Sequence, residues 1–241
     1  EYDGRCVEVV PHIPEEVIGR IKRAGQKDRA DFVLIEIGGT VGEYQNMLFL
    51  EAARMMHLRS PRDVLFVLVS YLPVPQKIGE MKTKPTQYAV RTLNSAGIQP
   101  DIIIGRSEVP LDLPRKRKIS VFCNIEPENV ISAPDIESIY EVPINFEQEN
   151  LAKQILNKFE IRDRKCDLSS WNKLVSTIKN SEDIVKIGMV GKYFETGDFL
   201  LSDSYISVIE AIKHAAWFHK RRVELSWLNS EHYETYPKSL S

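Results

Sequence analysis

The stretch with the clearest capacity for chemistry is Gly79–Gln87, which holds two lysines, two threonines and a glutamine around a proline. A helical apolar pattern follows Pro85, and proline is tolerated in the first helical turn, where its missing N–H would be unpaired. The segment Lys82–Gln87 is therefore predicted to lie at a helix N-terminus, where free N–H groups and the dipole favour an anion. Lysine ammonium groups beside short hydroxyls suit a polyphosphate. A solvated turn with two surface lysines is the alternative.

A second candidate is Glu36, a charge inside the apolar run 31–39. Such a run, closed by two glycines, is typical of a strand buried on both faces of a parallel sheet. Buried carboxylates are usually paired or metal-bound, so Glu36 is a candidate ligand for Mg²⁺ held together with nucleotide phosphates. The alternative is a carboxylate bonded to backbone N–H groups or to a lysine. The glycine-rich loop Gly38–Gly42 behind it allows close backbone approach.

The basic run Arg115–Lys118 is most simply a solvated face. Lys118 is the member expected to point into a site, because it adjoins Ile119 at the start of a predicted strand. The segment Gly188–Tyr193 has neither the glycine spacing nor the hydroxyl of a phosphate-binding P-loop. The five histidines show no metal-ligand spacing.

The elements expected to position these residues alternate between strands and helices. The predicted strands are Cys6–Val10, 31–39, Val64–Leu72, Asp101–Ile104, Ile119–Asn124, Val185–Tyr193 and Val223–Leu228. The predicted helices are 14–24, Gln45–His57, Pro85–Ala96, Glu149–Phe159, Ser169–Lys179 and Asp203–His219, with Tyr140–Gln148 irregular. This alternation predicts an α/β fold with crossover helices, in which ligands collect beyond the carboxyl ends of the strands.

The composition excludes several classes of function. The 32 basic and 34 acidic residues nearly cancel, so no global field would recruit nucleic acid or an anionic membrane. The longest apolar run is too short to span a bilayer. Three cysteines without a C-x-x-C pair fit a reducing, cytoplasmic setting. Because the chain opens on Glu1 next to a predicted strand and stops at Ser241 after another, both ends are expected to be cut from something longer.

Several blocks together resemble the CTP synthase family of glutamine-dependent amidoligases. The blocks are Glu36–Gly42, Gly79–Gln87, Gly97–Asp101, Lys118–Asn124, Ile131–Ser132, Asp135–Tyr140 and Ile187–Tyr193. They stand in the family's order and at its spacing across nearly the whole chain.

The resemblance implies an incomplete P-loop-type synthetase domain in residues 1–160, a linker in 161–184, and the start of a class I glutamine amidotransferase domain in 185–241. In that family ATP phosphorylates O4 of the uracil of UTP, and ammonia from glutamine displaces the phosphate to give CTP. The implied ligands are UTP, CTP, ATP, glutamine and Mg²⁺, and the implied assembly is a homotetramer.

The resemblance also implies roles for particular residues. It implies that the UTP or CTP triphosphate is bound by Lys82, Thr83, Lys84, Pro85, Thr86, Gln87 and Lys118, in a site built across subunits. It implies that CTP is contacted by Glu43, Tyr44 and Gln45, that the ATP base is contacted by Pro134, Asp135 and Ile136, and that Mg²⁺ is bound by Glu36.

This chain departs from the family pattern in ways that bear on activity. Gln45 stands where the family has a second carboxylate, which puts the strength or selectivity of CTP feedback in question. The family's P-loop and second metal-binding aspartate are expected before Glu1, and its glutaminase nucleophile after Ser241. The chain alone is therefore expected to be inactive, and no catalytic residue is assigned: Cys123 and Cys166 do not fit a nucleophile position. The alternative function is a non-catalytic module that binds CTP or UTP or joins subunits.

Overall fold

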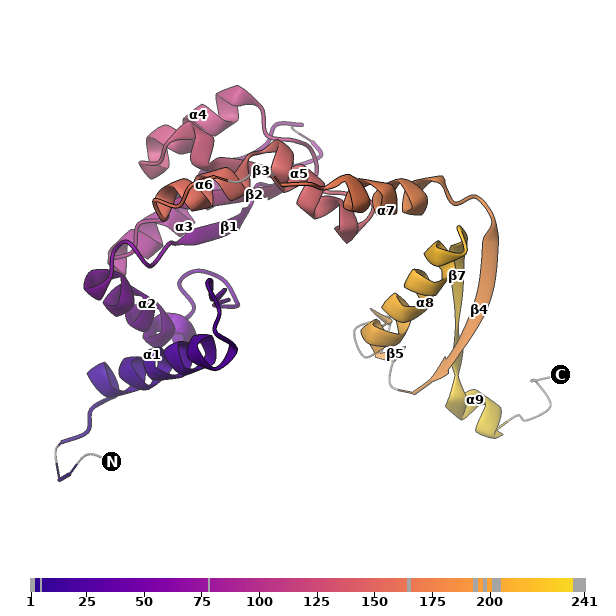
Figure 1. Ribbon diagram of the computed structural model, residues 1–241, viewed down its shortest axis with the longest axis horizontal. Coiled ribbons are helices and arrows are strands. Elements are labelled where there is room, and N and C mark those ends of the chain that lie inside the picture. The colour runs from indigo at the N-terminus through magenta and orange to yellow at the C-terminus, as the bar shows by residue number, and fades with distance from the viewer. Residues whose placement is uncertain are drawn as a thin grey trace. The chain divides into compact units, whose positions relative to one another are not determined.

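The computed structural model describes residues 3–4, 6–77, 79–163, 166–192, 195–196, 199–200 and 205–235. The chain divides into two compact units, Glu1–Lys165 and Cys166–Ser241, which are called unit 1 and unit 2. Figure 1 shows unit 1 in indigo to pink and unit 2 in orange to yellow. Within the described ranges, every helix is too short or too polar to serve as a membrane span.

Unit 1 is an α/β unit around a small parallel sheet. Its strands are β1 (Val67–Tyr71), β2 (Ile102–Ser107) and β3 (Val130–Pro134). Its helices are α1 (Val9–Asp28), α2 (Met47–Arg59), α3 (Lys84–Ser95), α4 (Leu113–Cys123), α5 (Val142–Gln148) and α6 (Leu151–Lys158). Short 3₁₀ turns are η1 (Tyr44–Asn46), η2 (Pro127–Asn129) and η3 (Ile139–Glu141).

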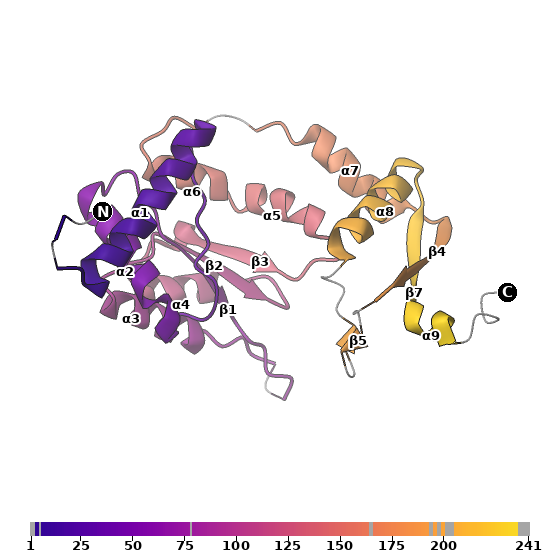
Figure 2. The same ribbon diagram turned by 90° about the horizontal axis from the view of Figure 1, so that it is seen from below.

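The sheet has the order β1-β2-β3, with neighbouring strands parallel. Figure 2 shows α3 and α4 on one face of the sheet and α5 and α6 on the other. Because the strands are parallel and joined by helices, their carboxyl ends meet at one edge, where Tyr71 pairs with Arg106 and Ser107 pairs with Pro134. The loops that leave this edge carry most of the candidate residues.

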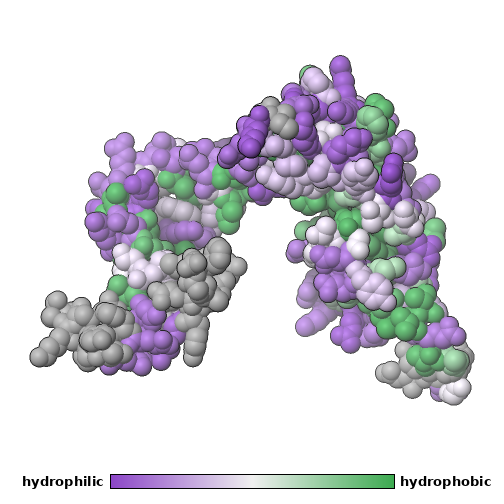
Figure 3. All heavy atoms as spheres, turned by 180° about the vertical axis from the view of Figure 1, so that it is seen from behind, coloured by the Kyte–Doolittle hydropathy of each residue, from purple (hydrophilic) through white to green (hydrophobic). Residues whose placement is uncertain are grey.

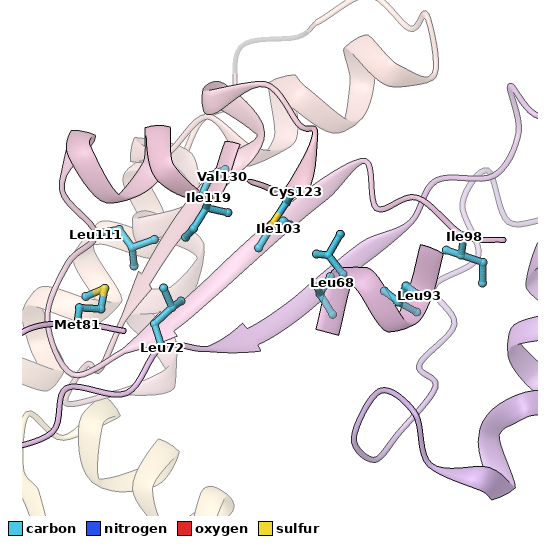
Figure 4. Close-up of a cluster of buried hydrophobic side chains, with 11 residues drawn as sticks. Leu68, Leu72, Met81, Leu93, Ile98, Ile103, Leu111, Ile119, Cys123 and Val130 are labelled. Atoms are coloured by element: carbon cyan, nitrogen blue, oxygen red, sulfur yellow. The ribbon is translucent and has the colours of Figure 1, made fainter. Parts of the chain in front are cut away.

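Two apolar clusters cover the two faces of the sheet. Figure 4 shows the larger one, which joins the strands to α3 and α4 through Leu68, Leu72, Met81, Val90, Leu93, Ile98, Ile103, Leu111, Ile119, Cys123 and Val130. The smaller one joins the sheet to α6 through Ile102, Ile104, Ile131, Ala133 and Leu151. Along β2 and β3, residues of the larger cluster alternate with residues of the smaller one, because successive side chains of a strand point to opposite faces.

Unit 2 contains one parallel βαβ arrangement. Its elements are α7 (Ser169–Asn180), β4 (Ile184–Gly191), β5 (Glu195–Thr196), β6 (Phe199–Leu200), α8 (Ile206–Phe218), β7 (Arg222–Asn229) and α9 (Ser230–Thr235). β4 pairs with β7 over its whole length, and α8 packs on β7. Tyr193 and residues 203–204, which belong to the predicted strand and helix, lie outside the described residues.

The predicted α/β class with parallel sheets is confirmed, but several element predictions are wrong. Helix α1 begins at Val9, inside the predicted first strand, and Tyr140–Gln148 forms η3 and α5. The predicted strand Ile119–Asn124 is the end of helix α4. β-branched residues favour strands, but local capping outweighs that propensity here. Asp112 caps the helix by accepting a 2.9 Å bond from the Arg115 N–H.

The run 31–39 belongs to no helix and pairs as a strand with no described residue. Leu34 is 97% exposed, and Phe32, Val33 and Ile35 are exposed as well. An apolar run becomes a buried strand only when neighbouring strands take up its N–H and C=O groups. Figure 3 shows further hydrophobic surface at the start of α1, where exposed residues include Val9. The prediction of a buried strand around Glu36 is therefore wrong.

Candidate functional site

Lys82 is fixed at the carboxyl end of β1 by its own backbone. The Lys82 N–H donates a 2.9 Å bond to the carbonyl of Pro73, which closes the loop that follows the strand. Met81 and Thr83, on either side, are buried at 5% and 4% exposure, and Met81 belongs to the larger apolar cluster. Because inward and outward side chains alternate, Lys82 and Lys84 point away from the core.

Helix α3 begins at Lys84, with Pro85 in its first turn, as predicted. Pro85 has no N–H and the Gln87 N–H bonds the carbonyl of Thr83, so the first helical turn leaves the N–H groups of Lys84 and Thr86 as donors for an anion. The Thr83 side chain does not cap the helix; its hydroxyl accepts a 3.1 Å bond from the amide of Gln87.

Thr86 is 0% exposed, and its hydroxyl lies 2.9 Å from that of Ser70 in β1. The two threonines of the predicted phosphate-binding segment are therefore turned inward. This geometry assigns Thr83 and Thr86 to positioning the segment, and leaves Lys82, Lys84 and Gln87 as the side chains available for contact.

Helix α4 brings Lys118 to the same side of the sheet as Lys84. Lys118 and Phe122 are one helical turn apart and both are exposed. The ammonium group of Lys84 lies 5.5 Å from the centre of the Phe122 ring, a cation–π distance. Lys118 therefore reaches this side of the sheet from a helix rather than from the predicted strand, and its role in a site with Lys82–Gln87 stays a prediction.

Glu80 is an acidic residue that lies next to these lysines. Its carboxylate accepts a 2.8 Å bond from the ammonium of Lys82. Lys82 lowers the pKa of Glu80 through this bond and its charge, and the charges of Arg115 and Lys118 lower it further. Lys82, Lys84 and Lys118 are called the basic cluster below. Three cations beside free helix N–H groups form an arrangement suited to a triphosphate.

The segment Glu43–Gln45 lies elsewhere on the chain. The backbone N–H of Thr40 and the side-chain amide of Gln45 donate to the Glu43 carboxylate at 2.7 and 3.0 Å, and these bonds lower the pKa of Glu43. Tyr44 is 89% exposed. This loop contacts α3 through Gly42, which lies against Thr92. Thr92 is about 12 Å along the helix axis from Lys84. The contacts within one chain therefore do not bring Glu43–Gln45 to the basic cluster.

A polar pair that the sequence did not reveal stands at the ends of β2 and β3. Arg106 donates a 2.9 Å bond to Asp135, and the Asp135 N–H bonds the carbonyl of Ser107 at 2.8 Å. Asp135 is one of the predicted ATP-contacting residues, between Pro134 and Ile136. The signal available was Arg106 itself, a charge at the carboxyl end of an apolar strand. A guanidinium donor beside a carboxylate acceptor fits the edge of an adenine base.

Glu36 is exposed in the run 31–39, and the described residues contain no group of three or more potential metal-binding side chains. Mg²⁺ commonly binds through one or two carboxylates together with water and phosphate oxygens. A single accessible carboxylate fits that chemistry only when a nucleotide supplies the other ligands.

Comparison with known proteins identifies the family. Residues 1–161 match the sequence model described as CTP synthase N-terminus. The chain belongs to the CTP synthase family. It is 46% identical over 241 residues to the CTP synthase of Pyrococcus furiosus, a match that covers 100% of this chain and 44% of that protein. It is 43% identical over 233 residues to the CTP synthase of Methanothermobacter thermautotrophicus, covering 96% and 43%.

A CTP synthase of Prochlorococcus marinus is 43% identical over 236 residues, covering 98% of this chain and 42% of that protein. The chain thus spans less than half the length of these CTP synthases. The family resemblance read from the sequence is confirmed. The domain boundaries, the glutamine amidotransferase start and the individual ligand contacts stay predictions.

Proposed function

We propose that this chain is part of an enzyme of pyrimidine biosynthesis that aminates UTP to CTP, and that its basic cluster binds the triphosphate of UTP or CTP. The reaction is a carbon–nitrogen ligation: ATP phosphorylates O4 of the uracil, and ammonia from glutamine displaces that phosphate. Three free cysteines fit the cytoplasm as the setting.

The observation that carries this proposal is the convergence of Lys82, Lys84 and Lys118. These three lysines come from a loop, a helix start and a second helix, and all three lie on the α3–α4 side of the sheet. Near-neutral total charge makes this a local concentration of cations rather than a general basic surface. A triphosphate, with its several negative charges on adjacent groups, matches that local concentration.

The ATP side of the reaction is assigned to the adjoining strand ends. Asp135 and Arg106 would bond the edge of the adenine, with Pro134 and Ile136 beside it. Glu36 would hold Mg²⁺ together with the nucleotide phosphates, and the ion supplies charge neutralisation on the phosphoryl oxygens.

The segment Glu43–Gln45 is assigned to a site completed by another subunit of a homotetramer. Its loop packs against the middle of α3, away from the basic cluster of its own chain. A loop in which Thr40 and Gln45 hold the Glu43 carboxylate in place and the Tyr44 ring is 89% exposed is suited to contact the base of a nucleotide held by a neighbouring chain.

The first prediction tests the triphosphate site by titration calorimetry of UTP and CTP into the chain. Lys82→Ala and Lys118→Ala are expected to weaken binding about tenfold or more, because a hydrogen bond to a charged group contributes about 1.5–3 kcal/mol. Lys153→Ala, which removes an exposed lysine of α6 on the opposite face of the sheet, is the matched control. Wild-type affinity in the Lys82 and Lys118 variants would contradict the site.

A further inference from the structure

Glu80 places a negative charge inside a site that we propose receives a negative ligand. It stands two residues before Lys82, and its carboxylate is 2.8 Å from the Lys82 ammonium. Both side chains are partly exposed, so the pair lies where a ligand can reach it. The backbone on either side of Glu80 is held by the bonds from the Gly79 N–H to the Pro75 carbonyl and from the Lys82 N–H to the Pro73 carbonyl. The Glu80 side chain itself is 55% exposed, so its carboxylate can turn away from Lys82 by side-chain rotation.

The other cations near Glu80 are differently engaged. Arg115 is bonded through its guanidinium to Asp112, within the cap of α4. Lys84 lies over the ring of Phe122. Among the residues that the structure describes, Lys82 is the member of the basic cluster that forms an ion pair with an acid. The positive charges of Lys82, Arg115 and Lys118 all lower the pKa of Glu80, so the carboxylate is ionised near neutral pH.

We propose that Glu80 is an internal competitor of the bound polyphosphate. Its carboxylate occupies the place beside the Lys82 ammonium that a phosphate group would take, so a phosphate must displace the carboxylate to bind there. This inference rests on the proposed function of the basic cluster. In the free protein the ion pair keeps Lys82 ordered at the end of β1. Glu80 also weakens the affinity for the nucleotide. The ligand must break the Glu80–Lys82 ion pair to form its own with Lys82, and it then lies near the negative charge of the displaced Glu80 carboxylate.

The experiment compares the whole chain with its Glu80→Gln variant by titration with inorganic tripolyphosphate and with UTP. Glutamine keeps the size of the side chain and removes its charge. Both ligands are expected to bind the variant roughly two- to fivefold more tightly, the effect of removing a partly exposed ion pair. Glu128→Gln removes an exposed acid at η2, at the opposite end of β3, and is expected to leave both affinities unchanged.

Two further variants separate displacement from a general loss of negative charge. Glu80→Ala should tighten binding as Glu80→Gln does, with thermal unfolding used to show that both proteins are folded. In a Lys82→Ala background, Glu80→Gln should tighten binding less than it does in the wild-type chain, because the ion pair is already absent.

The outcomes are distinguishable. If wild-type protein binds UTP and Glu80→Gln binds it equally or more weakly, the competitor role is overturned while the nucleotide site stands. An equal gain in affinity in the presence and absence of Lys82 would overturn the displacement of this ion pair. If neither protein binds tripolyphosphate or UTP, the nucleotide site itself is overturned, and this inference with it.

Discussion

Single residues in this chain owe their roles to whether the fold turns them inward or outward. Between Met81 and Lys84 the side chains alternate between the core and the surface, so the buried residues anchor the segment and the lysines remain accessible. Thr86 in the helix is likewise turned inward, because its buried hydroxyl bonds that of Ser70. The type of a residue suggests its chemistry, and its burial decides whether that chemistry reaches a ligand.

Cys123 gives a prediction at this scale. Burial raises the pKa of the Cys123 thiol to about 11, from an ordinary value of 9.0. At pH 8 only about one thiol in a thousand is then ionised, and the thiolate is the reactive form. A colorimetric thiol reagent at pH 8 should therefore modify the exposed Cys6 and Cys166 in the folded protein, and Cys123 only after unfolding. Rapid modification of all three thiols would contradict the buried position.

The same shift gives a pH dependence of stability. Because the folded state raises the pKa above its unfolded value, the stabilisation is complete below pH 9.0 and is lost as the pH rises through about 11. Over that range the wild-type chain should lose more stability than Cys123→Ala, which has no thiol to ionise.

At the scale of elements, a buried hydrogen bond between Ser70 and Thr86 adds to the apolar packing that joins β1 to α3. Ser70→Ala or Thr86→Val alone leaves a buried hydroxyl unpaired, and each is expected to destabilise unit 1 by about 1–3 kcal/mol. The double variant removes both hydroxyls and should cost less than the sum of the two. Thr86→Ser keeps the hydroxyl and should stay close to wild type.

Urea unfolding followed by circular dichroism measures these effects, and the chain provides an internal control. All three tryptophans, Trp171, Trp217 and Trp227, lie in unit 2, so the fluorescence transition should not move. If the bond positions the basic cluster, the double variant should also bind UTP more weakly than its stability alone explains. Additive losses in the two single variants would contradict a shared bond.

The elements also show what a sequence can and cannot predict. Helix α3 was predictable because Pro85 and the apolar spacing agree with each other. Helix α4 carried readable signals in Asp112 and Pro114 that outweigh the strand propensity of its last residues. The run 31–39 was not predictable, because its pattern satisfies a buried strand and only the presence of paired neighbours decides whether one forms. Ser70 and Arg106 gain their roles from partners distant in sequence, Thr86 and Asp135. The charge of Arg106 at the end of an apolar strand was a local signal, but it does not name the partner.

At the scale of the whole molecule, the family was predictable because its blocks occur in a fixed order along the chain, and that order does not depend on any single element. The exposed apolar run 31–39 cannot be interpreted in this way. Its effect is on association between chains, which is observed only in solution. Leu34 is 97% exposed in a run whose backbone groups have no strand partner among the described residues. Such a segment is a template for pairing with another chain.

The last prediction follows from this run. Leu34→Asp should reduce concentration-dependent association, measured by light scattering, because a charge in the middle of the segment opposes edge-to-edge pairing. The free energy of unfolding should change by no more than about 0.5 kcal/mol, since the side chain makes few contacts to lose. Ile139→Asp changes another exposed apolar residue, in η3, and should leave association unaltered. A wild-type chain that stays monomeric at every concentration would show that the exposed run does not drive association, and an equal effect of both substitutions would assign the association to exposed apolar area in general.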